Sequence, residues 1–115
     1  MTTPANPPWE ISPHDLREAL QRGEPITLLD CREPHERAIC AIRPSDRFIP
    51  LAELPERLDE LADVGEAPLI VYCHHGSRSL RAAKLLRRAG FPHAQSLAGG
   101  VDAWTRRIDP TLPRY

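Results

Sequence analysis

The chain has 115 residues, with 15 basic and 16 acidic side chains and a formal net charge of −1. This length suits one domain with a single core, and the balanced charge argues against the strong positive field of a general nucleic-acid binder. No apolar stretch is long enough to cross a membrane, and the polar start of the chain, with no basic segment, is unlike a secretory signal.

The first elements are a flexible lead over residues 1–8 and a helix that begins at Ser12. Ser12 is a good N-cap, Pro13 suits the first turn and Gly23 is placed to end the helix. Further along, the pattern predicts a buried strand over 26–30, a short helix over 34–40 and a short strand over 48–49.

The second half of the chain begins with an amphipathic helix, predicted from Leu54, Leu58 and Leu61. Residues 69–72 form the clearest strand, because this apolar run suits a parallel sheet that is buried on both faces. The remaining elements follow in order: a polar loop over 73–78, a helix over 79–88, a short strand over 94–97 and a helix over 101–108. Trp9 and Trp104 are expected to anchor the core.

Strands that alternate with helices predict an α/β domain over residues 9–115, a parallel sheet flanked by helices on both faces. Ligands of such sheets bind beyond the carboxyl ends of the strands. Asp30 and Cys73 both stand at that edge.

The loop between the clearest strand and the next helix carries the most informative residues. Cys73 opens it, and the substrate-binding candidates follow: His74, His75, Gly76, Ser77, Arg78 and Ser79. Backbone N–H groups in such a loop can converge on one point, and the adjacent helix N-terminus favours a thiolate there. Gly76 permits a backbone conformation that other residues avoid, and Arg78 offers a planar fork to an oxyanion. This arrangement suits Cys73 as a nucleophile that carries sulfur as a persulfide.

Each of these residues also has a plainer interpretation. A cysteine after a buried strand is usually an inert apolar residue. His74 and His75 either bind the donor or contribute only their backbone amides, and neither has metal-ligand spacing. Asp30 and Arg32 either pair to brace the loop or form a plain structural ion pair, which is the preferred interpretation, and Arg32 facing the donor is a further alternative.

The other two cysteines, Cys31 and Cys40, are expected to be small core residues. Three cysteines without paired metal-ligand spacing indicate neither a disulfide framework nor a zinc site. The sequence therefore predicts a reduced, cytoplasmic protein that needs no metal and no cofactor.

Four motifs in this order resemble the rhodanese family. They are 29–34 (Leu-Asp-Cys-Arg-Glu-Pro), 48–51 (Phe-Ile-Pro-Leu), the Cys-x-x-Gly-x-Arg-Ser pattern of 73–79, and 97–104 (Leu-Ala-Gly-Gly-Val-Asp-Ala-Trp). The resemblance implies a five-stranded parallel sheet, sulfur transfer through Cys73 and an anionic donor bound with help from Arg78. The tail over 108–115 resembles rhodanese domains that are fused to enzymes activating ubiquitin-like sulfur carriers.

Two departures from the family qualify this resemblance. The family's Gly-His-Ile-x-Gly-Ala stretch is absent from residues 38–46, and the loop has two histidines where members that prefer thiosulfate tend to carry Lys or Arg.

The length of the loop separates two chemistries. Related phosphatases place five residues between Cys and Arg, whereas four separate Cys73 from Arg78, which favours sulfur over phosphate chemistry.

The sequence thus predicts a sulfurtransferase that moves a sulfane sulfur from thiosulfate or a persulfide to cyanide, a thiol or a protein. The alternative is a protein-to-protein sulfur carrier with little activity on small molecules, for which a ubiquitin-like sulfur-carrier pathway is the candidate context. Neither hypothesis involves nucleic acid or a membrane.

Overall fold

The computed structural model describes residues 6–115 as one parallel sheet between two layers of helices. The strands are β1 (Glu10–Ile11), β2 (Thr27–Asp30), β3 (Arg47–Phe48), β4 (Leu69–Tyr72) and β5 (Ala94–Leu97). Their spatial order is β1-β5-β4-β2-β3 and every pairing is parallel, which confirms the predicted fold class. No helix among the described residues is long and apolar enough to cross a bilayer.

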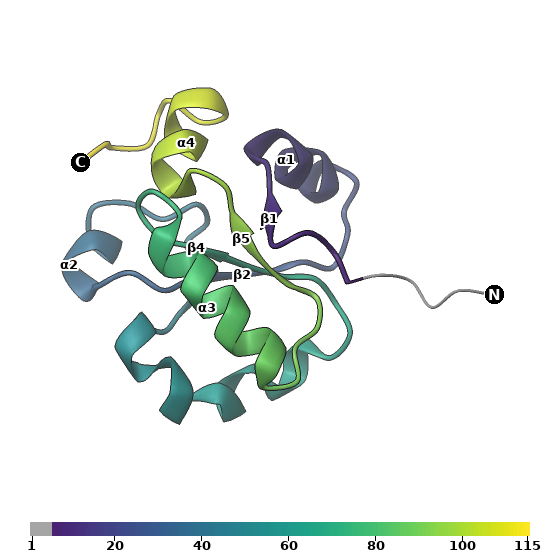
Figure 1. The fold of residues 1–115 in the computed structure, drawn as a ribbon. Coiled ribbons are helices and arrows are strands. Elements are labelled where there is room, and N and C mark those ends of the chain that lie inside the picture. The colour runs from purple at the N-terminus through teal and green to yellow at the C-terminus, as the bar shows by residue number, and fades with distance from the viewer. Residues whose placement is uncertain (1–5) are drawn as a thin grey trace.

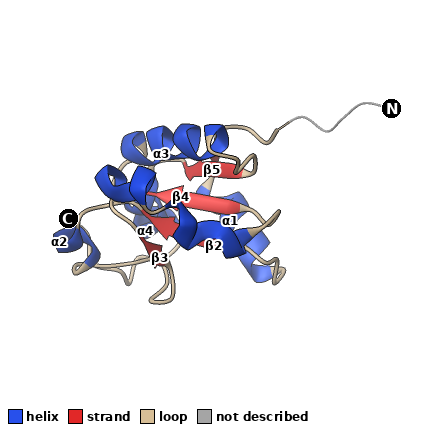
Figure 2. Cartoon of the chain, turned by 90° about the horizontal axis from the view of Figure 1, so that it is seen from below, coloured by secondary structure: helices blue, strands red, loops and turns tan. Residues whose placement is uncertain are grey.

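The two faces of the sheet bury separate apolar clusters. One face packs against α3 (Ser77–Arg88) and the two 3₁₀ segments η1 (Leu51–Glu56) and η2 (Leu58–Val64). The other face packs against α1 (Pro13–Gln21) and α4 (Gly100–Arg107). Figures 1 and 2 show α3 on the opposite side of the strands from α1 and α4.

The central strand β4 positions the residue of greatest interest. All four of its residues are buried, and it pairs with β2 on one side and β5 on the other. Asp30 is the register partner of Tyr72, so β2 and β4 end side by side. Cys31 N–H then donates to the Tyr72 carbonyl at 3.0 Å. Cys73 therefore leaves the sheet directly beside the end of β2.

The short helix α2 (Pro34–Arg37) follows β2 at this carboxyl edge. The Glu33 side chain accepts from the third helical residue, and the Glu36 side chain accepts from Glu33 N–H at 3.1 Å, which makes a capping box. Figure 1 shows the C-terminal end of the chain on the same side of the molecule as α2. This proximity brings Tyr115 to Glu36 in the site described below.

Several predicted elements need correction. The amphipathic helix over residues 54–61 is wrong in type, because the chain forms two 3₁₀ segments that break at Arg57. Pro55 explains the change, since it has no N–H to donate inside an α-helix, yet Leu54 and Leu61 still face the core. The helix predicted over 79–88 begins two residues earlier, at Ser77.

The N-terminal edge of the sheet also differs from expectation. No element was predicted at β1, whose two residues have no periodicity and which is held by pairing with β5. Trp104 is buried as predicted, but Trp9 is 44 % exposed and lies under the Arg87 guanidinium, 3.9 Å from the ring centroid. Residues 1–5 of the predicted lead lie outside the described residues, and the Pro7 carbonyl accepts from Arg87 at 2.7 Å.

Candidate active site

Cys73 is the centre of the candidate active site. Its Sγ accepts hydrogen bonds from two backbone N–H groups, Gly76 at 3.1 Å and Ser79 at 3.3 Å. Both donors belong to the start of α3, where the helix dipole adds positive potential. Amides that are fixed in this way stabilise negative charge on sulfur without any basic side chain.

The Ser79 hydroxyl extends this network away from the sulfur. It lies 3.3 Å from Cys73 Sγ and 2.7 Å from the hydroxyl of Ser96 on β5. Both serines are fully buried, and the Gly76 carbonyl accepts from Ser79 at 3.2 Å. Ser79, a sequence candidate, therefore fixes the loop from the sheet side, and Ser96 is a contributor that the sequence did not indicate.

Gly76 allows the loop to curl against its neighbours. Gly76 has φ of +111° and caps the N-terminus of α3. Opposite it, the first amides of α4 hold the loop carbonyls: Val101 N–H donates to Cys73 O at 2.8 Å, and Asp102 N–H donates to His74 O at 3.0 Å. A peptide N–H points opposite to its carbonyl. The amides of His74 and His75 consequently point away from α4.

Arg78 lies at the site but is already paired. Its two terminal nitrogens donate to the two carboxylate oxygens of Glu36, at 2.7 and 2.9 Å. These bonds outweigh burial and lower the pKa of Glu36 from its usual 4.5 to about 2. Since a guanidinium has five N–H donors, three remain for an anionic ligand. Arg78 also borders an open groove of about 420 Å³, together with Cys31, Glu33, Leu51, Ala52, Pro55, Arg81 and Leu85.

Asp30 and Arg32 form the buried ion pair that the sequence indicated. Arg32 Nε and Nη2 donate to the two Asp30 oxygens at 2.9 and 2.8 Å, and both side chains have 0 % exposure. The alternative, in which Arg32 faces the donor, is wrong, because the guanidinium is enclosed and also donates to the Cys40 carbonyl. The pair thus belongs to the frame behind the loop.

Two further residues complete the site and were not indicated by the sequence. They are Glu36 and Tyr115. The Tyr115 hydroxyl donates to Glu36 Oε2 at 2.8 Å and accepts from Arg32 Nη1 at 2.8 Å. Glu36 could have been suspected from its capping box, but nothing in the sequence pattern links Tyr115 to it.

The two loop histidines differ in their surroundings. His75 is exposed, whereas His74 is half-buried between the His75 ring, 3.8 Å away, and the Tyr115 ring, 3.9 Å away. Burial, reinforced by His75, lowers the pKa of His74, and its buried Nε2 has no hydrogen-bond partner. His74 is therefore a neutral packing residue at pH 7 rather than an exposed one.

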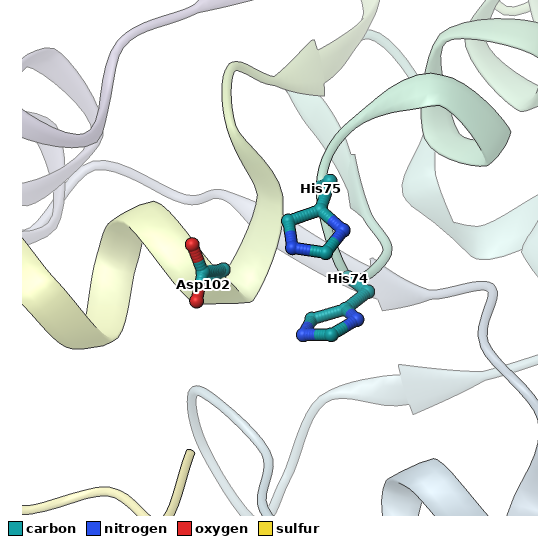
Figure 3. A group of neighbouring side chains, drawn as sticks. All are labelled: His74, His75 and Asp102. Carbon is teal, nitrogen blue, oxygen red and sulfur yellow. The ribbon is translucent and has the colours of Figure 1, made fainter. Parts of the chain in front are cut away.

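His74, His75 and Asp102 are the described residues best placed to hold a metal ion (Figure 3). Their ligand atoms lie within 4.8 Å of one another, and Asp102 reaches the loop from the first turn of α4. The Asp102 carboxylate already pairs with Arg106 at 3.0 Å and Arg114 at 3.5 Å. These two cations oppose the binding of a third, so the expectation that the site needs no metal stays a prediction.

The remaining cysteines are core residues, as expected. Cys31 is 1 % exposed and Cys40 is 8 % exposed, and all three thiols are free. Desolvation raises the pKa of Cys31, so this thiol is a poor nucleophile at neutral pH. Of the three cysteines, Cys73 is the one on whose Sγ two backbone amide donors converge.

This combination of fold and loop is that of a known family. The family model for the rhodanese-like domain matches residues 12–107, and the chain belongs to this family. A solved rhodanese-related protein from Thermoplasma volcanium superposes with a TM-score of 0.74 at 31 % identity, covering 90 % of this chain and 94 % of that one. The human single-domain sulfurtransferase TSTD1 gives a TM-score of 0.71 at 29 % identity, covering 88 % and 98 %.

Curated relatives fall into two kinds. The adenylyltransferase and sulfurtransferase MOCS3-1 of Zea mays is 40 % identical over 91 % of this chain, which spans only 23 % of that protein. The thiosulfate sulfurtransferase GlpE of Actinobacillus pleuropneumoniae is 38 % identical, over 92 % of this chain and 94 % of its own length. The chain thus spans about a quarter of the longer relatives and nearly all of the shorter one, and both kinds include sulfurtransferases.

Proposed function

We propose that this chain, folded as one domain over residues 9–115, is a sulfurtransferase that carries a sulfane sulfur on Cys73. The observation that carries the proposal is the pair of backbone amides, Gly76 and Ser79, that donate to Cys73 Sγ. Such donors favour the thiolate before attack and an anionic terminal sulfur after it.

The reaction follows from this geometry in two steps. The Cys73 thiolate attacks the outer sulfur of a donor such as thiosulfate, the donor's S–S bond breaks, and sulfite leaves with the bonding electron pair. The product is a Cys73 persulfide whose terminal sulfur is anionic. An acceptor nucleophile, which is cyanide, a thiol or a protein, then attacks that sulfur and the Cys73 thiolate leaves. Neither step needs a metal or a cofactor.

The proposed roles of the other residues follow their contacts. The loop amides of residues 74–79 hold the anionic sulfur, and the free donors of Arg78 attract the anionic donor from the adjoining groove. Asp30 and Arg32 support the loop from behind. Three free thiols support a reducing compartment, and a cytoplasmic location is part of this proposal.

A second candidate function has its own support. The chain is 40 % identical to a domain-sized part of an adenylyltransferase and sulfurtransferase, which supports a protein in a sulfur-carrier pathway as the natural donor or acceptor. In that case the Cys73 chemistry is the same, but small donors react slowly and a persulfidated protein reacts fast.

The test is the intact mass of the reduced protein after incubation with thiosulfate. We expect a gain of about 32 Da that cyanide removes and that Cys73→Ser abolishes. Cys31→Ser and Cys40→Ser are matched controls that should keep the gain. A gain only with a persulfidated protein would favour the carrier, and no gain with any donor would refute sulfur transfer.

A further inference from the structure

Tyr115 occupies a position that neither the family motifs nor the proposed reaction explains. Its hydroxyl donates to Glu36 Oε2 and accepts from Arg32 Nη1, each at 2.8 Å. Two charged groups of opposite sign therefore share one phenol. Burial contributes most to the raised pKa of Tyr115, which keeps the hydroxyl protonated and able to donate at physiological pH.

The hydroxyl completes a continuous chain of hydrogen bonds: Asp30, Arg32, Tyr115, Glu36 and Arg78. One end is the carboxyl end of β2, where the ion pair is fully buried. The other end is the first turn of α3, which carries the amides that face Cys73 Sγ. Tyr115 is the uncharged link that joins the buried pair to the pair at the site.

The ring of Tyr115 makes a second, separate contact with the loop. It stacks on His74 with 3.9 Å between the ring centroids and 11° between the planes. The segment that brings it there is attached, since Leu112 packs on the core and Arg114 pairs with Asp102 at 3.5 Å. The ring and the hydroxyl thus hold different parts of the same site.

We propose that Tyr115 is a positioning residue, which fixes Glu36 and so sets where the Arg78 guanidinium presents its free donors to an anionic sulfur donor. This inference rests on the proposed sulfurtransferase function. Without the hydroxyl, Arg32 Nη1 and Glu36 Oε2 each lose a partner, and apart from Arg78 the Glu36 carboxylate is then held only by Glu33 N–H at Oε1, so it can turn about that contact. Arg78, held by both Glu36 oxygens, must then turn with it.

The chain offers a matched pair of variants, because it has two tyrosines. Tyr115→Phe removes the hydroxyl and keeps the ring on His74. Tyr72→Phe is the control: its hydroxyl is also engaged, donating to Asp46 at 2.9 Å, and it makes no contact with Glu36 or Arg78. We expect Tyr115→Phe to raise the KM for thiosulfate about three- to tenfold with a smaller change in kcat. Tyr72→Phe should leave KM unchanged.

A second readout is independent of sulfur transfer. In the ¹⁵N-labelled protein, the guanidinium signals of Arg78 report how firmly Glu36 holds it. We expect these protons to exchange with water several-fold faster in Tyr115→Phe than in the parent or in Tyr72→Phe. Unchanged exchange in Tyr115→Phe would overturn the positioning role. If exchange rises while the parent takes up no sulfur from any donor, the proposed function fails but the positioning of Arg78 stands.

Discussion

Gly100 lies against the carbonyl oxygens of His74 and Cys73 so closely that no side chain fits between them. A Cβ added to Gly100 would lie 2.6 Å from Cys73 O and closer still to His74 O. Gly100 also has φ of +64°, which other residues rarely adopt. The start of α4 and the Cys73 loop are therefore fitted to each other at the level of the backbone.

Gly100→Ala should consequently be among the most damaging small substitutions in the chain. We expect a loss of more than about 3 kcal/mol in the free energy of unfolding, because strain at positive φ adds to the clash with two carbonyls. Gly23→Ala is the matched control, since φ is +73° there and nothing lies within 4 Å of an added Cβ. It should lose only about 1 kcal/mol. Urea titration measures both, and equal losses would contradict the fitted contact.

The Glu36–Arg78 pair should make stability depend on pH in the acid range. The pKa of Glu36 is about 2 in the folded protein against 4.5 ordinarily, so the folded state binds the proton less tightly than the unfolded state. This contribution is therefore complete above about pH 4.5 and is lost as the pH falls towards 2. We expect a loss of about 1–3 kcal/mol from this pair over that interval.

Glu36→Gln provides the comparison for that measurement. Its unfolding free energy should be lower than the parent's at pH 7, and the gap between the two should narrow from pH 5 to pH 2. Urea titrations at a series of pH values give this difference. A gap that stays constant between pH 5 and pH 2 would show that the pairing with Arg78 does not lower the pKa of Glu36.

Ser79→Ala should slow the uptake of sulfur by Cys73. The hydroxyl lies 3.3 Å from Sγ and connects it with Ser96, so its loss removes a polar partner of the sulfur but neither amide donor. We expect about a tenfold lower rate in a time course of intact mass. Ser96→Ala, which removes the more distant hydroxyl, should have a smaller effect, and the reverse order would refute this account.

Alanine variants of the two loop histidines should differ in activity in the same sulfur-uptake assay. His75 is exposed, so we expect His75→Ala to keep most of the activity if only its backbone amide acts. His74→Ala should lower it further, because the ring that Tyr115 stacks on is lost.

In the Cys73→Ser variant, calorimetry with Zn²⁺ should detect no tight site, since Arg106 and Arg114 already hold Asp102. Tight Zn²⁺ binding that is lost in Asp102→Asn would instead show that the side chains in Figure 3 form a metal site.

The sequence predicted best where one short segment decides the structure. Residues 69–72 form a strand because the run is apolar throughout, and the turn into the next helix follows from Gly76. The core positions of Cys31 and Cys40 also followed from residue type. Local pattern was enough in each case, although Pro55 shows that a correct apolar spacing does not fix the type of helix.

The missed residues share a different property, which is that their partners are remote in the chain. Glu36 meets Arg78 across 42 positions, and Tyr115 meets Glu36 across 79. No periodicity encodes such a meeting, since it depends on where the sheet edge, α2 and the segment after α4 come together. β1 was missed for the same reason, because its two residues are defined by pairing with β5.

The dependence of the Cys73 loop on later residues has a consequence during synthesis. The amides that hold its carbonyls belong to Val101 and Asp102, and the link to Arg78 belongs to Tyr115. A nascent chain that ends before residue 100 thus has the cysteine without the contacts that shape its loop. Reactivity should therefore appear only after residues 100–115 have emerged from the ribosome and docked, so that shorter nascent chains expose an ordinary thiol rather than an active one.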